Sequence, residues 1–143
     1  MTLLEAFLLE LGEREIPGTK HNDRIIAYHE ATTLKAKTDE IPWCSSFINY
    51  LALKCGLERS NSAAARSWLN VGTAIEEKDL PDINPNRNII AIFKRGKSPT
   101  SGHVAIYVQR TLLGILVAGG NQSNACNFAT YNKRDILGFM ELK

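Results

Sequence analysis

The sequence predicts an α+β protein, because helical patterns fill its first half and short strand patterns fill its second. Apolar residues recur at helical spacing in residues 3–11, and a second amphipathic pattern begins near Pro42. From residue 88 onward, β-rich runs alternate with segments rich in Gly, Pro and Ser. Helices that precede strands in this way favour N-terminal helices packed on one face of a small antiparallel sheet.

The predicted helices begin with residues 3–11, where Thr2-x-x-Glu5 has the pattern of a capping box. A short helix is expected near Arg24–Glu30. The next helix starts at Pro42, whose missing N–H costs nothing in a first turn, and ends at Gly56. A further helix is expected from a cap at residues 60–62 through AAARSWL to residue 72.

The predicted strands are residues 88–94, 103–109, 114–118 and 136–140. The second and third of these are close enough in sequence to form a hairpin. Residues 119–126 are interpreted as a turn followed by a polar segment.

The composition is that of one soluble globular domain spanning residues 1–143, with 44% hydrophobic and 22% charged residues. The net charge is +2, and no basic run gives a footprint for nucleic acid. The N-terminus lacks a basic region and a small-residue cleavage site, so we expect synthesis in the cytoplasm without a signal peptide. No stretch is long enough to insert in a membrane, and a monomer is expected.

Three cysteines are present, and an odd number without a secretion signal argues against a disulfide framework. No CxxC or His/Cys cluster with zinc spacing occurs, so we expect no metal and no cofactor. Cys44 is predicted to start a helix, where the dipole and free N–H groups stabilise a thiolate. Cys55 is at the opposite end of that helix, and Cys126 lies in a polar segment with no evident activator.

A base for such a thiolate is most plausible at His103, which begins the clearest strand pattern in the chain. His21 and His29 lie in a polar region where surface histidines are common. If 103–109 and 114–118 form a hairpin, Asn121 comes close to His103 and can orient its ring. Taken singly, Cys44 can be interpreted as a packing residue, His103 as a structural histidine, and the segment at Asn121 as a turn. Together they favour a cysteine hydrolase.

The blocks PWCSSF, SAAARSWL, GHVAIYV and AGGNQ stand in the order found in a family of hydrolases. The chain resembles the NlpC/P60 and CHAP group of papain-like cysteine hydrolases from residue 3 to Met140. The resemblance implies Cys44 as nucleophile, His103 as base and Asn121 as the orienting residue. Gln122 is a lesser rival to Asn121, because this third position varies in the group. The group usually has Gly-Asp where this chain has residues 87–88, Arg-Asn.

The resemblance also implies a substrate, the amide bonds of bacterial peptidoglycan. It favours a phage or prophage endolysin, either an endopeptidase or an N-acetylmuramoyl-L-alanine amidase, that causes bacteriolysis. Without a signal peptide, such an enzyme reaches the periplasm or cell wall through a holin, a virion or a secretion system. The alternatives are an injected antibacterial amidase effector, a non-catalytic wall-binding or virion component, and a hydrolase of another amide.

The oxyanion hole is expected to use the Cys44 backbone N–H and one further donor. Tyr28 is a candidate for that donor, because related enzymes carry a tyrosine before the nucleophile. An ordinary half-buried aromatic is an equal interpretation.

Several side chains near the nucleophile are candidates for substrate binding. Asp39 and Glu40 can read amino groups of a stem peptide, although solvated loop acids are the commoner case. For Arg66, a structural ion pair and a contact with the substrate are equally good interpretations. Trp43 is expected to cover one side of the nucleophile, and Trp68 to belong to the core.

Overall fold

The computed structural model describes residues 1–17, 21–36, 42–84 and 86–143. Three α-helices, six strands and three short 3-10 helices form this described part. The helices are α1 (Leu3–Leu8), α2 (Asp23–His29) and α3 (Cys44–Cys55), and the 3-10 helices cover Ala65–Asn70, Glu77–Asp79 and Lys133–Asp135. The strands are β1 (Thr73–Ile75), β2 (Ile89–Lys94), β3 (Gly102–Thr111), β4 (Gly114–Gln122), β5 (Ala125–Tyr131) and β6 (Ile136–Glu141).

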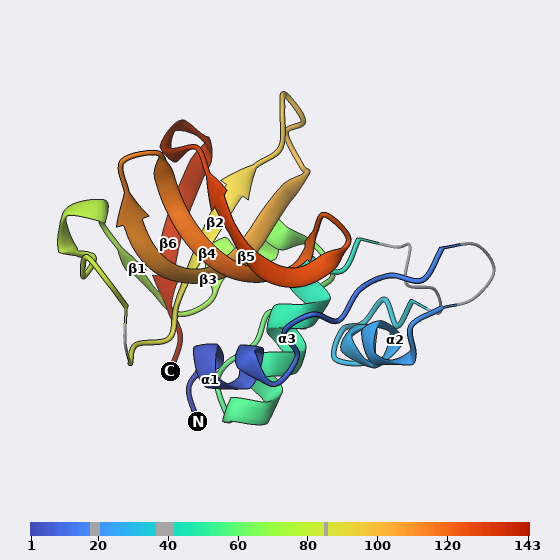
Figure 1. Cartoon of the computed structure of the whole chain (residues 1–143). Coiled ribbons are helices and arrows are strands. Elements are labelled where there is room, and N and C mark those ends of the chain that lie inside the picture. The colour runs from blue at the N-terminus through green and yellow to red at the C-terminus, as the bar shows by residue number, and fades with distance from the viewer. Residues whose placement is uncertain (18–20, 37–41, 85) are drawn as a thin grey trace.

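The strands form one sheet in the order β1-β6-β2-β3-β4-β5, and all neighbours are antiparallel. Figure 1 shows this curved sheet lying above the three helices, with α3 directly beneath its centre. The predicted α+β architecture is therefore confirmed, and so is the antiparallel β3–β4 hairpin on which the expected site depends.

Two apolar clusters lie on opposite faces of the sheet, as the alternation of side chains along a strand requires. The larger cluster packs the helices, through residues such as Phe7 and Phe47, against Ile92 and Val104 of the sheet. The smaller one holds Phe93 and eight further buried residues on the other face. Residues 92 and 93 thus point to opposite faces, and so do 103 and 104. Consequently, the Val104 side chain packs toward the helices, and the His103 ring packs beside Phe93 on the other face of the sheet.

The helix ends follow the sequence closely. The Thr2–Glu5 capping box forms at the start of α1, and α3 ends at Gly56, whose φ of 69° suits glycine. The predicted helix at 60–72 is wrong in length, because only Ala65–Asn70 is helical and the turn type is 3-10. Asn49 explains this: its side chain accepts from the Asn61 N–H and donates to the Ser62 carbonyl, which holds this segment out of a helix.

Two strands were not predicted. The three-residue β1 is too short to give a pattern, and it pairs only with β6. The segment interpreted as polar contributes to β5, an edge strand whose exposed positions are Phe128 and Thr130. β4 also extends to Gln122, beyond the predicted end at 118, because Gly119 still pairs with Asn127 of β5. Among the helices in the described ranges, none has the length and apolar character that a membrane crossing needs.

Candidate active site

Cys44 is the first residue of α3, and the residue before it fixes the start of that helix. Trp43 is fully buried, and its indole N–H donates to Glu15 Oε2 at 3.0 Å. It gives the helix no side-chain cap, so the first-turn N–H groups are not covered from that side. These amides are the ones that can stabilise a negative sulfur or oxygen atom.

Two glycines of β4 let the helix and the strand approach each other. A Cβ atom at Gly120 would lie 2.6 Å from the Trp43 ring, and one at Gly119 would lie 2.9 Å from Gln122 Oε1. Neither distance is compatible with a side chain. The Gly-Gly pair therefore makes room for the tryptophan on one face of β4 and for the glutamine on the other.

His103 is the second residue of β3 and is 1% exposed. Its ring centroid lies 5.0 Å from that of Tyr131 and 6.3 Å from that of Phe93. His103 Nε2 lies 2.9 Å from Gln122 Oε1. These neighbours hold the imidazole in one orientation.

The hydrogen bonds of Gln122 also assign the proton on the imidazole. The Gln122 amide nitrogen donates to the Asn127 carbonyl at 2.8 Å and to Asn127 Oδ1 at 3.0 Å. Its Oε1 must therefore accept, so His103 Nε2 carries the proton and donates. His103 Nδ1 is then left with a lone pair. Among the described residues this buried atom has no hydrogen-bond partner.

Gln122, the lesser rival in the sequence analysis, is the residue whose side chain is hydrogen-bonded to His103, whereas no such bond joins Asn121 to the ring. Between Gly119 and Gln122 the register of β4 shifts, and Asn121 has a φ of 56°. This irregularity interrupts the alternation that the hairpin argument assumed. As a result, the side chain one residue later reaches His103.

The Cys44 thiol lies against β3 next to His103. It is in hydrogen-bond contact with the backbone N–H of Val104, and with those of Cys44 and Ser45 at the helix start. Burial raises the pKa of the Cys44 thiol, and these N–H groups together with the positive charge of Arg95 oppose that effect. Burial also lowers the pKa of His103 to about 4, against the hydrogen bond to Gln122. Both the Cys44 thiol and the His103 imidazole are therefore neutral at pH 7.

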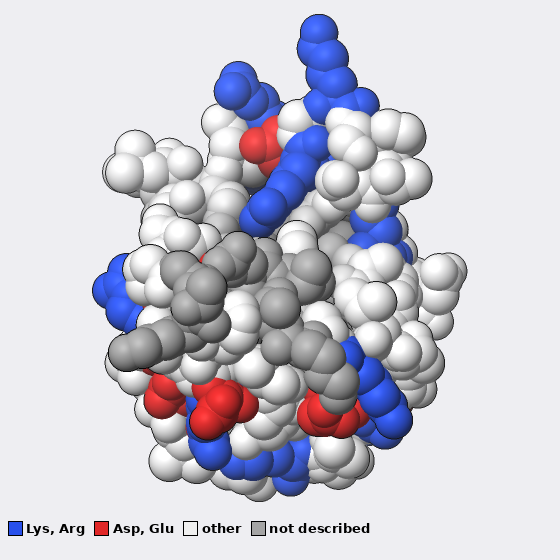
Figure 2. All heavy atoms as spheres, turned by 90° about the vertical axis from the view of Figure 1, so that its right-hand side faces the viewer, with Lys and Arg blue, Asp and Glu red and all other residues white. Residues whose placement is uncertain are grey.

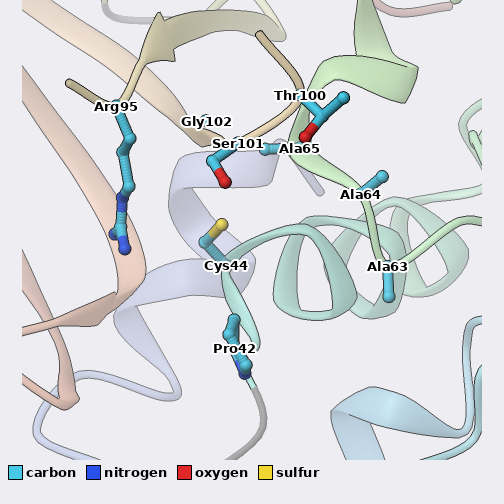
Figure 3. A pocket seen from close by; sticks show the side chains of 9 residues that line it. All are labelled: Pro42, Cys44, Ala63, Ala64, Ala65, Arg95, Thr100, Ser101 and Gly102. Carbon is cyan, nitrogen blue, oxygen red and sulfur yellow. The ribbon is translucent and has the colours of Figure 1, made fainter. Parts of the chain in front are cut away.

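A pocket of about 260 Å³ gives access to the thiol (Figure 3). In Figure 3, the Cys44 sulfur lies near the middle, and the Ser101 hydroxyl points toward it from above. The residues lining the pocket are Pro42, Cys44, Ala63, Ala64, Ala65, Arg95, Thr100, Ser101 and Gly102. Cys44 is thus buried by its neighbours and still borders an open cavity.

The structure does not bring Tyr28, the candidate for the second oxyanion donor, into the pocket at Cys44. It is fully buried, and its hydroxyl donates to Glu10 Oε1 at 2.9 Å. It does not belong to the lining of the pocket at Cys44. The tyrosine joins α2 to the segment after α1, which is a structural role.

The substrate-binding candidates have different outcomes. Trp43 is fully buried, so it offers no surface to a substrate. Arg66 donates to the carbonyls of Ser101 and Ser98, at 2.9 Å and 2.8 Å, and so holds the loop before β3. Trp68 is in the core as predicted. Asp39 and Glu40 lie outside the described residues.

Arg95 and the three alanines at 63–65 are lining residues that the sequence reasoning missed. A signal for Arg95 was present, because it directly follows the strand that pairs with the start of β3. The alanines carry no polar group, and only the fold reveals that they form a wall. In the described part of the chain, no cluster of His, Cys, Asp and Glu is suited to a metal ion.

No protein-family model matches the chain, and a search of curated proteins finds no significant match.

Proposed function

We propose that this chain is a papain-like cysteine hydrolase that cleaves amide bonds of peptidoglycan stem peptides, with Cys44, His103 and Gln122 as its triad. One observation carries the chemistry: the hydrogen bond from His103 Nε2 to Gln122 Oε1, which leaves Nδ1 as a base that no described residue occupies. The residue next to this base touches the Cys44 thiol through its amide. The order of the four sequence blocks favours peptidoglycan as the substrate.

The reaction begins from the neutral pair. As the Cys44 sulfur attacks the amide carbonyl, the thiol proton passes to His103 Nδ1, and a tetrahedral intermediate forms. The imidazolium then gives that proton to the leaving nitrogen, so an amine departs and a thioester remains on Cys44. Water attacks the thioester while Nδ1 takes its proton. Collapse of the second intermediate releases the carboxylic acid and restores the thiol.

Backbone amides at the start of α3 support the negative oxygen of each intermediate. The N–H groups of Cys44 and Ser45 already contact the sulfur, so they are directed at the reacting centre. Gln122 keeps the imidazole in the tautomer that this sequence of proton transfers needs. In the cell, such an enzyme fits an endolysin that reaches the wall with the help of a holin or a virion.

Purified peptidoglycan tests the proposal directly. The wild type should release muropeptides that mass spectrometry identifies by a new amine and a new carboxyl end, and the mass also shows which bond is cut. Cys44→Ala should release none. Cys55→Ala is the matched control, since it removes the same group from the opposite end of the same helix and should act like the wild type. Equal release by Cys44→Ala would contradict the proposal.

A further inference from the structure

Arg95 brings a positive charge into the pocket beside Cys44. It directly follows β2, is exposed, and lines the pocket. Figure 3 shows its side chain extending down one side of the pocket, level with Cys44. Its charge is close enough to influence the titration of Cys44, His103 and Tyr131.

The guanidinium of Arg95 has no partner in the described part of the chain, neither an ion pair nor a hydrogen bond. Arg14 and Arg134 likewise have no side-chain partner among the described residues, but neither lines the pocket. Other arginines show which groups a guanidinium binds in this protein. Arg24, Arg87 and Arg110 each bind a carboxylate, and Arg66 binds two carbonyl oxygens. A planar guanidinium matches the two oxygens of a carboxylate, so an unpartnered one in a pocket is suited to an anionic ligand.

The surroundings of Arg95 strengthen this expectation. Among the described residues that line the pocket, none is Asp or Glu. Lys94 and Lys97, on either side of Arg95, are also exposed. In Figure 2, Lys and Arg side chains project from the upper end of the molecule, where the connection between β2 and β3 lies. This end of the pocket therefore repels cations and attracts anions.

The opposite side of Cys44 has a different character. Figure 3 shows Ala63, Ala64 and Ala65 there, and their methyl groups form a wall without charge. A wall of methyl groups leaves room for a small apolar side chain and offers nothing to a charged one. The two flanks of the nucleophile thus select different chemical groups.

We infer that Arg95 binds a substrate carboxylate beside the scissile amide, while the alanine wall receives a small apolar side chain on the other flank. This inference rests on the proposed function, because it assigns the flanks of the bond that Cys44 attacks. Stem peptides of peptidoglycan combine these two features, since they contain alanine next to acidic residues whose carboxyl groups are free or amidated. The site should prefer the free acid.

Two alkylating reagents of nearly equal size test the carboxylate site without any hydrolysis. Iodoacetate carries the charge that Arg95 would bind, and iodoacetamide is its neutral counterpart. The rate of Cys44 modification by each is measured by peptide mass spectrometry in the wild type, Arg95→Gln and Lys97→Gln. The ratio of the two rates cancels any change in the reactivity of the thiol itself.

We expect Arg95→Gln to lower the iodoacetate-to-iodoacetamide ratio by about tenfold, the effect of one favourable charge contact of roughly average strength. Lys97→Gln makes the same charge change on the same connection, outside the pocket lining, and should leave the ratio near that of the wild type. An equal fall in both variants, no fall in Arg95→Gln, or failure of both reagents to reach Cys44 would overturn the inference.

The same proteins are then given stem peptides that differ only in a free or amidated carboxyl group beside the cleaved bond. The wild type should favour the free acid, and Arg95→Gln should lose this preference. If the reagent ratio behaves as expected but no peptide is cut, the proposed function fails and the carboxylate site stands. If peptides are cut and neither ratio depends on Arg95, the function stands and the inference fails.

Discussion

Cys44 and Cys126 are both buried thiols whose pKa lies above the ordinary value, yet their surroundings differ in kind. Burial raises the pKa of Cys126 to about 12, the hydrogen bond with Tyr28 opposes this, and the carboxylates of Glu10 and Glu13 add to the effect of burial. Its sulfur lies 3.9 Å from the Tyr28 hydroxyl, which already donates to Glu10. Around Cys44, by contrast, three backbone N–H groups and a cation oppose the effect of burial.

The Cys126 region is a closed structural cluster. Glu10 is 1% exposed and receives hydrogen bonds from Arg24 and Tyr28, which ties the residue after α1 to α2. Burial opposes ionisation of Glu10, but these two hydrogen bonds hold its pKa below the ordinary value. The Cys44 region instead has an open pocket and an imidazole nitrogen without a partner among the described residues. Access and a free base, more than burial, distinguish a reactive thiol from a packing one.

The largest expected difference is between alanine variants of the two cysteines. Cys44→Ala should lower peptidoglycan hydrolysis by about 10⁴-fold or more, because the nucleophile is lost. Cys126→Ala removes one buried sulfur and should cost about 1 kcal/mol of unfolding free energy with little effect on rate. Rates of muropeptide release and urea unfolding curves measure both. Comparable rate losses in the two variants would erase the distinction.

The neutral state of His103 gives a pH dependence of stability. The folded chain keeps the imidazole neutral down to about pH 4, whereas the unfolded chain protonates it near the ordinary histidine pKa of 6.5. The unfolded state thus binds more protons between these values, so the contribution is full above pH 6.5 and is lost as the pH falls toward 4. Between pH 7 and pH 4.5, the wild type should lose about 2–3 kcal/mol more than His103→Gln. If the unfolding free energies of the wild type and His103→Gln change with pH in parallel, the imidazole is not a buried neutral group.

The choice between Gln122 and Asn121 predicts a smaller effect. Gln122→Ala should lower the rate on the order of tenfold to 100-fold, because the base remains but loses its orientation. Asn121→Gly is the matched control, since glycine accepts a φ of 56° and the rate should change by less than about twofold. The opposite order of the two effects would return the orienting role to Asn121.

Tyr28 gives the smallest expected effect on activity. Tyr28→Phe removes the hydrogen bond to Glu10 and should cost about 1–2 kcal/mol of unfolding free energy. The rate measured well below the unfolding midpoint should stay within about twofold of the wild type, because this hydroxyl is bonded to Glu10 and Tyr28 does not line the pocket. A loss of about 100-fold at unchanged stability would make Tyr28 an oxyanion donor after all.

Much of the architecture could be predicted from local patterns. The start and end of α3, the cap of α1 and the β3–β4 hairpin each depend on residues near one another in the chain, such as Gly56 and Thr2. The edge strand β5 escaped prediction because the polar residues at 121–124 and 127 hide its pattern and no alternation of apolar and polar residues marks it. The 60–72 segment was misjudged because Asn49, a residue of another helix, holds it by hydrogen bonds.

The candidate site shows the same difference between features set by residues near in the chain and features set by distant ones. Cys44 and His103 were candidates because each occupies the start of a predicted element. The exact partner of the imidazole was not predictable, since a register shift of β4 decides between adjacent side chains. Arg95 and the alanine wall meet only in the folded chain, and Arg66 turned out to hold the loop between them.

A protein with a single thiol tests the central claim most directly. In Cys55→Ala/Cys126→Ala, only Cys44 remains, so iodoacetamide can block no other cysteine. The account predicts that this protein hydrolyses peptidoglycan and that its activity falls in proportion to the fraction of Cys44 modified, reaching zero when intact mass shows complete reaction. Activity that persists in the fully modified protein would contradict the account.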